Sequence, residues 1–184
     1  AKNAFKLDVD AAFKTESFEI TLPMKEDIPY TYDEIRNIHP QIDEAQRRLD
    51  EAIARGDAPA QVKRLIDDRW RVGHIIRGEE YGFTEQQLAA HEVTVCVTAL
   101  RFGGYLFVGV PGESLVDMTL WLRSRFSGAK TVSVDQIGGY YNYMATPRSM
   151  TLGGYTYWSS WVRRDAIPIF KAALAPKLDA FMRD

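Results

Sequence analysis

Residues 93–110 constrain the fold more than any other stretch, because their apolar side chains first alternate and then become continuous. Val93, Val95 and Val97 occupy every second position, a Gly103-Gly104 turn follows, and residues 105–110 are almost entirely apolar. Alternation followed by a glycine turn and a second apolar run predicts a β-hairpin. Because the second strand is apolar on both faces, we expect it in the middle of a sheet and buried on both sides.

This second strand runs directly into Pro111-Gly112-Glu113. Ligands of open sheets usually gather at the carboxyl ends of the strands, so Glu113 is the first candidate for a functional residue. A helix is predicted over residues 114–125 and a strand over residues 130–134. A strand-helix-strand crossover makes the two strands parallel, which places the loop at 138–143 at the same edge as Glu113.

The remaining segments predict supporting elements. Residues 17–22 alternate like a strand at a sheet edge, and Thr84 to Gln87 match a capping box. Helical periodicity up to residue 55 and again after Pro59, with Gly56 between, predicts an αα-hairpin inserted at residues 33–77. A final helix packs on the sheet, interrupted or restarted by Pro176. The predicted fold class is α/β (mixed α+β): a central mixed sheet with flanking helices, in one domain spanning residues 1–184.

Composition excludes several kinds of protein. The net charge of −2 in 184 residues does not call for nucleic acid or an anionic membrane as a partner. No run approaches the ~20 apolar residues of a transmembrane helix. The single cysteine, Cys96, cannot form an internal disulfide, and its place in a strand favours a buried apolar role over that of a nucleophile.

Residues 138–158 are rich in glycine and aromatic side chains, which predicts an irregular loop. The six aromatic residues between its positions 140 and 158 are too apolar to leave in water without a use. They either plug the end of the sheet or line a pocket, and the sequence leaves both possibilities open.

The motifs Val110-Pro111-Gly112-Glu113-Ser114, Tyr143-Met144-Ala145-Thr146-Pro147 and Gly154-Tyr155 resemble the C-terminal part of the catalytic domain of neutral (non-lysosomal) ceramidases. The predicted αα-hairpin also resembles an insertion of bacterial members. The resemblance implies a zinc-dependent hydrolase of N-acyl amides, with Zn²⁺ as its cofactor. It implies that Glu113 and Tyr143 are zinc ligands and that Tyr155 hydrogen-bonds the scissile carbonyl.

The family takes two further zinc ligands, both histidines, from a region N-terminal to the part resembled here. His39, His74 and His91 lack metal-ligand spacing, so we interpret all three as structural or surface residues. The expected partner is therefore an N-terminal fragment or a separate chain that carries the histidines, and the sheet is expected to be an incomplete half of a larger catalytic domain. Thr156 stands where the family has an acidic residue, which leaves the amide substrate open.

The resemblance also favours a secreted or periplasmic location. The alternative function is a non-catalytic subunit of the same fold that binds a lipid or a partner and has lost the metal site. In a third interpretation, the αα-hairpin is an assembly device and the chain is chiefly a scaffold.

Overall fold

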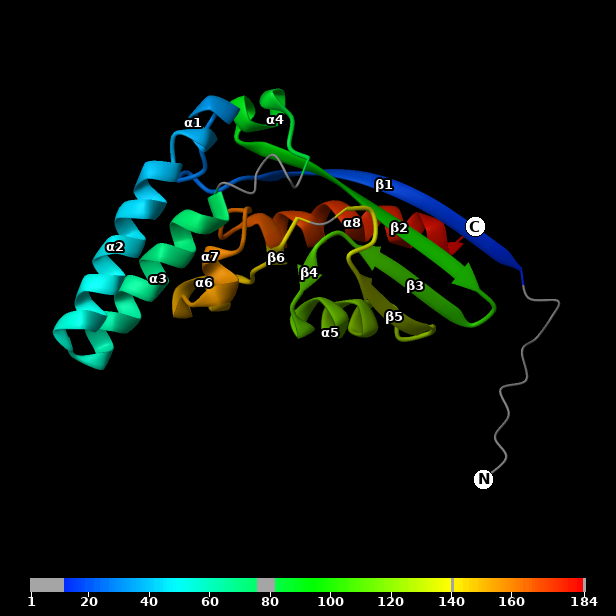
Figure 1. Cartoon of the computed structure of the whole chain (residues 1–184). Helices are drawn as coiled ribbons and strands as arrows, with labels where there is room; N and C mark the ends of the chain where they lie inside the picture. Colours follow the sequence, from blue (N-terminus) through cyan, green and yellow to red (C-terminus); the bar gives the residue numbers. More distant parts are fainter. Residues whose placement is uncertain (1–11, 76–81, 140, 184) are drawn as a thin grey trace.

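The computed structural model describes residues 12–75, 82–139 and 141–183 (Figure 1). Its elements follow one another as β1 (Phe13–Pro23), α1 (Tyr32–Arg36), α2 (His39–Arg55), α3 (Pro59–Ile75), α4 (Glu85–Ala90), β2 (Glu92–Phe102), β3 (Tyr105–Val110), β4 (Glu113–Ser114), α5 (Val116–Arg125), β5 (Lys130–Asp135), β6 (Tyr143–Met144), α6 (Pro147–Leu152), α7 (Tyr155–Trp158) and α8 (Ala166–Arg183). The protein is a mixed α/β fold with helices flanking a mixed sheet, as the sequence predicts.

The main sheet has the strand order β1-β2-β3-β5. β2 and β3 form the predicted antiparallel hairpin, and β3 pairs with β5 in parallel after the α5 crossover. The predicted edge position of β1 and central position of β3 are both confirmed. The carboxyl ends of β3 and β5 consequently lie at one edge of the sheet, next to β4.

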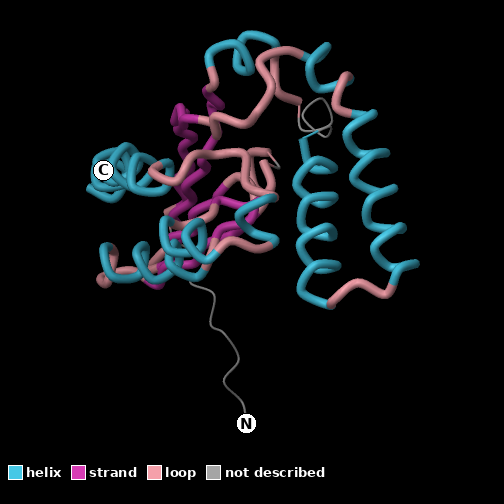
Figure 2. Tube along the Cα trace, turned by 90° about the vertical axis from the view of Figure 1, so that its left-hand side faces the viewer, coloured by secondary structure: helices cyan, strands magenta, loops and turns pink. Residues whose placement is uncertain are grey.

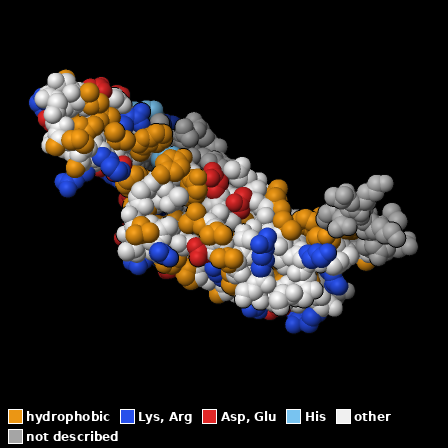
Figure 3. All heavy atoms as spheres, turned by 90° about the horizontal axis from the view of Figure 1, so that it is seen from below, with side chains coloured by type: hydrophobic (Ala, Val, Ile, Leu, Met, Phe, Trp, Pro, Cys, Tyr) orange, Lys and Arg blue, Asp and Glu red, His pale blue; other side chains and the backbone are white. Residues whose placement is uncertain are grey.

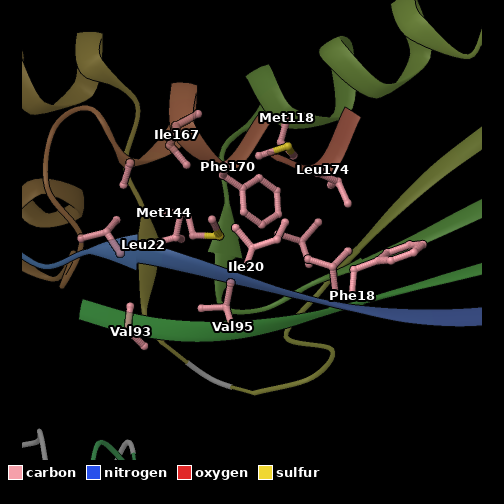
Figure 4. Packing of buried hydrophobic residues seen from close by; sticks show 14 of the residues in the cluster. Phe18, Ile20, Leu22, Val93, Val95, Met118, Met144, Ile167, Phe170 and Leu174 are labelled. Carbon is pink, nitrogen blue, oxygen red and sulfur yellow. The ribbon is translucent and has the colours of Figure 1, made fainter. Parts of the chain in front are cut away.

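One face of the sheet carries the core. Alternate residues of β1 and β2, such as Phe18, Ile20 and Val95, pack against Met118 of α5 and Phe170 of α8 (Figure 4). Both helices therefore cover the same face, as their contacts with β5 and β1 also indicate.

The opposite face is only half-buried, which corrects the expectation that β3 is enclosed on both sides. Tyr105 and Phe107 of β3 stack on each other at 6.1 Å between ring centroids, and both remain partly exposed, as does Cys96 on β2. No helix among the described residues covers these side chains. The apolar composition of β3 therefore predicted its central position in the sheet correctly, but it did not predict that one face of the strand is left without a covering helix.

α2 and α3 form the predicted αα-hairpin, which projects beside the sheet (Figures 1 and 2). Ala45, Leu49 and Ala52 recur on the buried side of α2 at helical spacing. Gly56 ends α2 with a φ of +73°, a left-handed conformation that glycine adopts without strain. The last two residues of the predicted 33–77 insertion lie outside the described part of the chain.

Two local predictions were wrong. The loop expected at 138–158 contains β6 and the short helices α6 and α7, because Thr146 caps α6 by accepting a hydrogen bond from the Ser149 N–H at 3.2 Å and Pro147 suits its first turn. Pro176 does not interrupt α8, which is continuous from Ala166 to Arg183. Pro176 has no N–H to donate to the Ala172 carbonyl. Both residues lie on the exposed side of α8, where water can hydrogen-bond to that carbonyl.

Within the described residues, no helix combines the length and the apolar character that crossing a membrane would require.

Candidate functional site

Gly112 turns the chain at the end of β3 and delivers Glu113 to the sheet edge. Its φ is +75°, and its N–H donates to the Gly139 carbonyl at 3.1 Å, while its own carbonyl accepts from the Gln136 N–H at 2.9 Å. A Cβ at Gly112 would lie 2.3 Å from the Asn142 carbonyl oxygen. Only glycine permits this close approach of the two backbone segments.

β4 and β6 form a separate two-stranded parallel sheet in which Glu113 and Tyr143 are register partners. The Glu113 N–H donates to the Asn142 carbonyl at 2.8 Å, which fixes this register. Both side chains are half-buried. The carboxylate and the phenol, brought from segments on either side of β5, thus start from adjacent backbone positions.

After β6 the chain passes through α6 and a Gly153-Gly154 turn, in which both glycines have positive φ, and this path brings Tyr155 back beside Tyr143. Tyr155 is the first residue of α7, and its ring lies edge-on to that of Tyr143, with 5.5 Å between the centroids. The three residues singled out by sequence, Glu113, Tyr143 and Tyr155, are therefore brought together.

The αα-hairpin adds two side chains that the sequence gave no reason to select. Trp70 and His74, one helical turn apart on α3, lie 6.0 Å and 5.7 Å from the Tyr155 ring, measured between centroids. The only local signal is their i,i+4 spacing, which places them on one helix face. Nothing in that spacing identifies the tyrosine they meet.

The three histidines occupy different environments. His74 is buried, His39 is exposed at the start of α2, and His91 stacks on Tyr30 with 3.8 Å between the ring centroids. His91 also ends α4 in a left-handed conformation, with a φ of +52°.

The aromatic residues of the 138–158 segment divide between the two alternatives left open above. Tyr141 stacks on the buried Phe83, with 5.8 Å between the ring centroids, and so helps to plug the end of the sheet. Burial raises the pKa of the Tyr141 phenol. Tyr155 is 50% exposed and faces the candidate site instead. Tyr140 lies outside the described residues.

Lys25 supports α7 from the other side. Its ammonium group donates to the Tyr157 carbonyl at 3.1 Å and lies 4.9 Å from the centre of the Tyr157 ring. Burial lowers the pKa of this ammonium group, the Asp27 carboxylate opposes that shift, and Arg71 adds to it. A buried cation with these contacts fixes α7 against the start of the loop after β1.

Two oxygen donors at adjacent positions suit part of a zinc site, since zinc accepts carboxylate oxygens alongside nitrogen and sulfur. The described residues contain no group of three His, Cys, Asp or Glu side chains arranged to hold a metal ion. A zinc ion beside Glu113 and Tyr143 would need further donors besides these two side chains.

Comparison of the chain with protein-family models, with curated proteins and with solved structures finds no match.

Proposed function

We propose that this chain forms part of a zinc-dependent hydrolase that cleaves linear N-acyl amide bonds. In this proposal Glu113 and Tyr143 hold the metal, and Tyr155 donates a hydrogen bond to the oxygen of the scissile carbonyl. Two histidines from an N-terminal fragment or a partner chain complete the ligand set.

The observation that carries the proposal is the register pairing of Glu113 with Tyr143, with the Tyr155 ring 5.5 Å from that of Tyr143. These three residues belong to three separate sequence motifs. A carboxylate and two phenols at one sheet edge combine metal-binding oxygens with a hydrogen-bond donor, which is what amide hydrolysis assisted by a metal requires.

Each residue has a distinct task in this chemistry. Zinc, when bound, supplies a Lewis acid that polarises the amide carbonyl and makes water more acidic. Tyr155, half-exposed at the start of α7, can reach a substrate and stabilise negative charge on the carbonyl oxygen. Its ring contacts three other aromatic rings, which limits the reorganisation needed during the reaction.

The open parts of the sheet support the proposed partner. β5 pairs only with β3 among the described strands, so its outer edge is free to accept another strand. Val116 and Leu120 on α5, the helix that packs against β5, and Val134 on β5 itself are exposed apolar side chains. Figure 3 shows hydrophobic side chains reaching the surface along the underside of the molecule.

The test is the zinc content of the chain purified together with the polypeptide encoded upstream of it. We expect about one zinc per complex in the natural protein, with both zinc and amide hydrolysis lost in Glu113→Ala. Glu92→Ala removes an exposed carboxylate at the start of β2 and serves as the control, with zinc and turnover unchanged.

Retention of zinc and activity in Glu113→Ala would refute the assignment. A complex that contains no zinc yet still binds acyl lipids would instead favour the alternative function, a binding subunit that has lost its metal site.

A further inference from the structure

α3 joins the αα-hairpin to the candidate site through Trp70 and His74. Their rings stack on each other at 5.7 Å, and each lies edge-on to Tyr155, at interplanar angles of 87° for Trp70 and 65° for His74. Edge-to-face aromatic contacts at these distances are favourable and directional. The ring of Tyr155 consequently contacts two rings of α3 in addition to that of Tyr143.

His74 contacts both ends of α7. It is 5% exposed, its ring touches Tyr155 at the first position of α7, and its Nε2 lies 3.2 Å from the Oγ of Ser159, the residue that ends this helix. The Ser159 N–H in turn donates to the Tyr155 carbonyl at 2.9 Å. A single buried side chain therefore fixes the short helix that carries Tyr155.

Trp70 plays a different part because it is 49% exposed, about as much as Tyr155. Two half-exposed aromatic rings from distant segments therefore lie in contact at the surface, and exposed apolar surface of this kind can mark a binding site. This surface continues into a groove of about 470 Å³ along the hairpin, within the range of small-molecule sites. The groove is lined by Gln46, Leu49, Ile66, Arg69, Trp70, Gly73 and His74.

The lining of the groove combines apolar and polar side chains. Leu49, Ile66 and Trp70 supply apolar surface, whereas Arg69 donates from its Nε to the Gln46 side-chain oxygen at 3.1 Å. Gly73 leaves the space that the guanidinium of Arg69 fills, since a Cβ there would lie 2.8 Å from Nη1. An apolar chain can contact the apolar lining residues while a polar group meets Arg69 and Gln46.

We propose that the αα-hairpin is part of the substrate site, with His74 as a positioning residue for Tyr155 and Trp70 as the contact for the apolar chain of the amide. This inference rests on the proposed function for the identity of the substrate. It gives the hairpin a role in specificity.

Trp70 is tested by binding of N-dodecanoylethanolamine to the 184-residue chain, measured by isothermal titration calorimetry. Trp70→Leu is expected to weaken the affinity about tenfold or more, which corresponds to ~1.4 kcal/mol. Ile53→Ala, an exposed apolar position on α2 outside the groove, is the matched control and should leave the affinity unchanged. Equal affinity of Trp70→Leu and the natural chain, or no binding by the natural chain, would overturn this role.

His74 is tested by NMR of protein with ¹³C-labelled tyrosine, the Tyr155 signal being assigned with Tyr155→Phe. His74→Leu should move the Tyr155 ring signal and leave that of Tyr105, on the far strand β3, in place. Should that variant not fold, His74→Gln, which keeps a hydrogen-bonding group near Ser159, tests the same point. An unchanged Tyr155 signal in the folded variant would refute the positioning role.

These experiments separate the two proposals. Trp70-dependent binding by the chain, together with a purified complex that holds no zinc, would support the hairpin site and contradict the zinc hydrolase. Glu113-dependent zinc in the complex, together with Trp70-independent binding by the chain, would support the hydrolase and contradict the hairpin site. In an active complex, His74→Leu should lower kcat with little change in KM, and Trp70→Leu should raise KM with little change in kcat.

Discussion

At Gly112 and Gly138 the backbone itself controls whether the candidate site can form. Both have positive φ, and a Cβ at either would meet a carbonyl oxygen at 2.3 Å, that of Asn142 or that of Cys96. Because the obstacle is backbone rather than a flexible side chain, neighbouring residues cannot simply rotate away. These two glycines hold the segments that carry Glu113 and Tyr143 against the main sheet.

Gly112→Ala is expected to lower the free energy of unfolding by roughly 2–3 kcal/mol, since strained backbone and a close contact are combined. Urea denaturation measures the change. Gly128→Ala, where a Cβ meets nothing within 4 Å and φ is not positive, is the matched control and should change stability little. Equal stability of the two variants would show that Gly112 does not constrain the β4–β6 pairing.

Lys25 makes stability depend on pH in a direction that follows from its environment. Burial sets the pKa of its ammonium group below the ordinary value of 10.5 in the folded state. Between the folded pKa and 10.5 the unfolded chain binds more protons than the folded one, so the contribution of Lys25 to stability becomes more favourable as pH rises through that interval. Below the folded pKa, both states are protonated and the contribution is constant.

The natural chain should therefore gain stability relative to Lys25→Met between pH 7 and pH 10. Chemical denaturation of both proteins at the two pH values measures this difference, and groups that titrate alike in both cancel. A difference that stays constant with pH would contradict the lowered pKa.

At the scale of elements, α8 tolerates a proline in its interior because of where that proline faces. Pro176 lies on the exposed side, whereas Phe170, Leu174 and Leu178 are buried against the sheet. The missing N–H still removes one helical hydrogen bond. The helix is retained because its buried side holds it on β1.

Pro176→Ala should accordingly raise the free energy of unfolding by roughly 1–3 kcal/mol, with the thermal midpoint rising in parallel. Pro168→Ala is the matched control in the same helix. Pro168 lies in the first turn, where its N–H would have no helical partner, so its replacement should change stability by less than about 0.5 kcal/mol. Destabilisation by Pro176→Ala would indicate that the fold depends on a bend at this position.

At the scale of the whole molecule, helices cover only one face of the described sheet, and the outer edge of β5 pairs with no described strand. Exposed apolar residues lie on α5, which packs against β5, and on β5 itself, while Tyr105 and Phe107 remain half-buried on the uncovered face. A sheet with such an edge readily pairs with another polypeptide. This arrangement agrees with the proposed partner that supplies the histidines.

Leu120→Glu should reduce association at this edge at least tenfold, whether with the upstream-encoded polypeptide or with a second copy of the chain, as measured by sedimentation velocity. Leu120 is exposed, so the change should alter folding stability by no more than about 0.5 kcal/mol. Ile53→Glu introduces the same charge at an exposed position of the hairpin and should leave association intact. A natural chain that stays monomeric without any companion would contradict the partner.

Local pattern was sufficient for most of the architecture. Alternation identified the β2–β3 hairpin, a change of period identified the αα-hairpin, and the crossover rule placed Glu113 beside the segment carrying Tyr143. These features depend on interactions between residues close in the sequence or on chain connectivity, and the amino-acid sequence specifies both directly.

The contacts of Tyr155 with Trp70 and His74, the single covered face of the sheet and the continuity of α8 through Pro176 were decided only by the tertiary structure. His74 and Ser159 are 85 positions apart, and no period or motif links them. Such contacts arise when elements that are each already stable bury their remaining apolar surface against one another. Their pairing is thus a property of the packed molecule, because the free energy gained depends on shape and burial that no single segment contains.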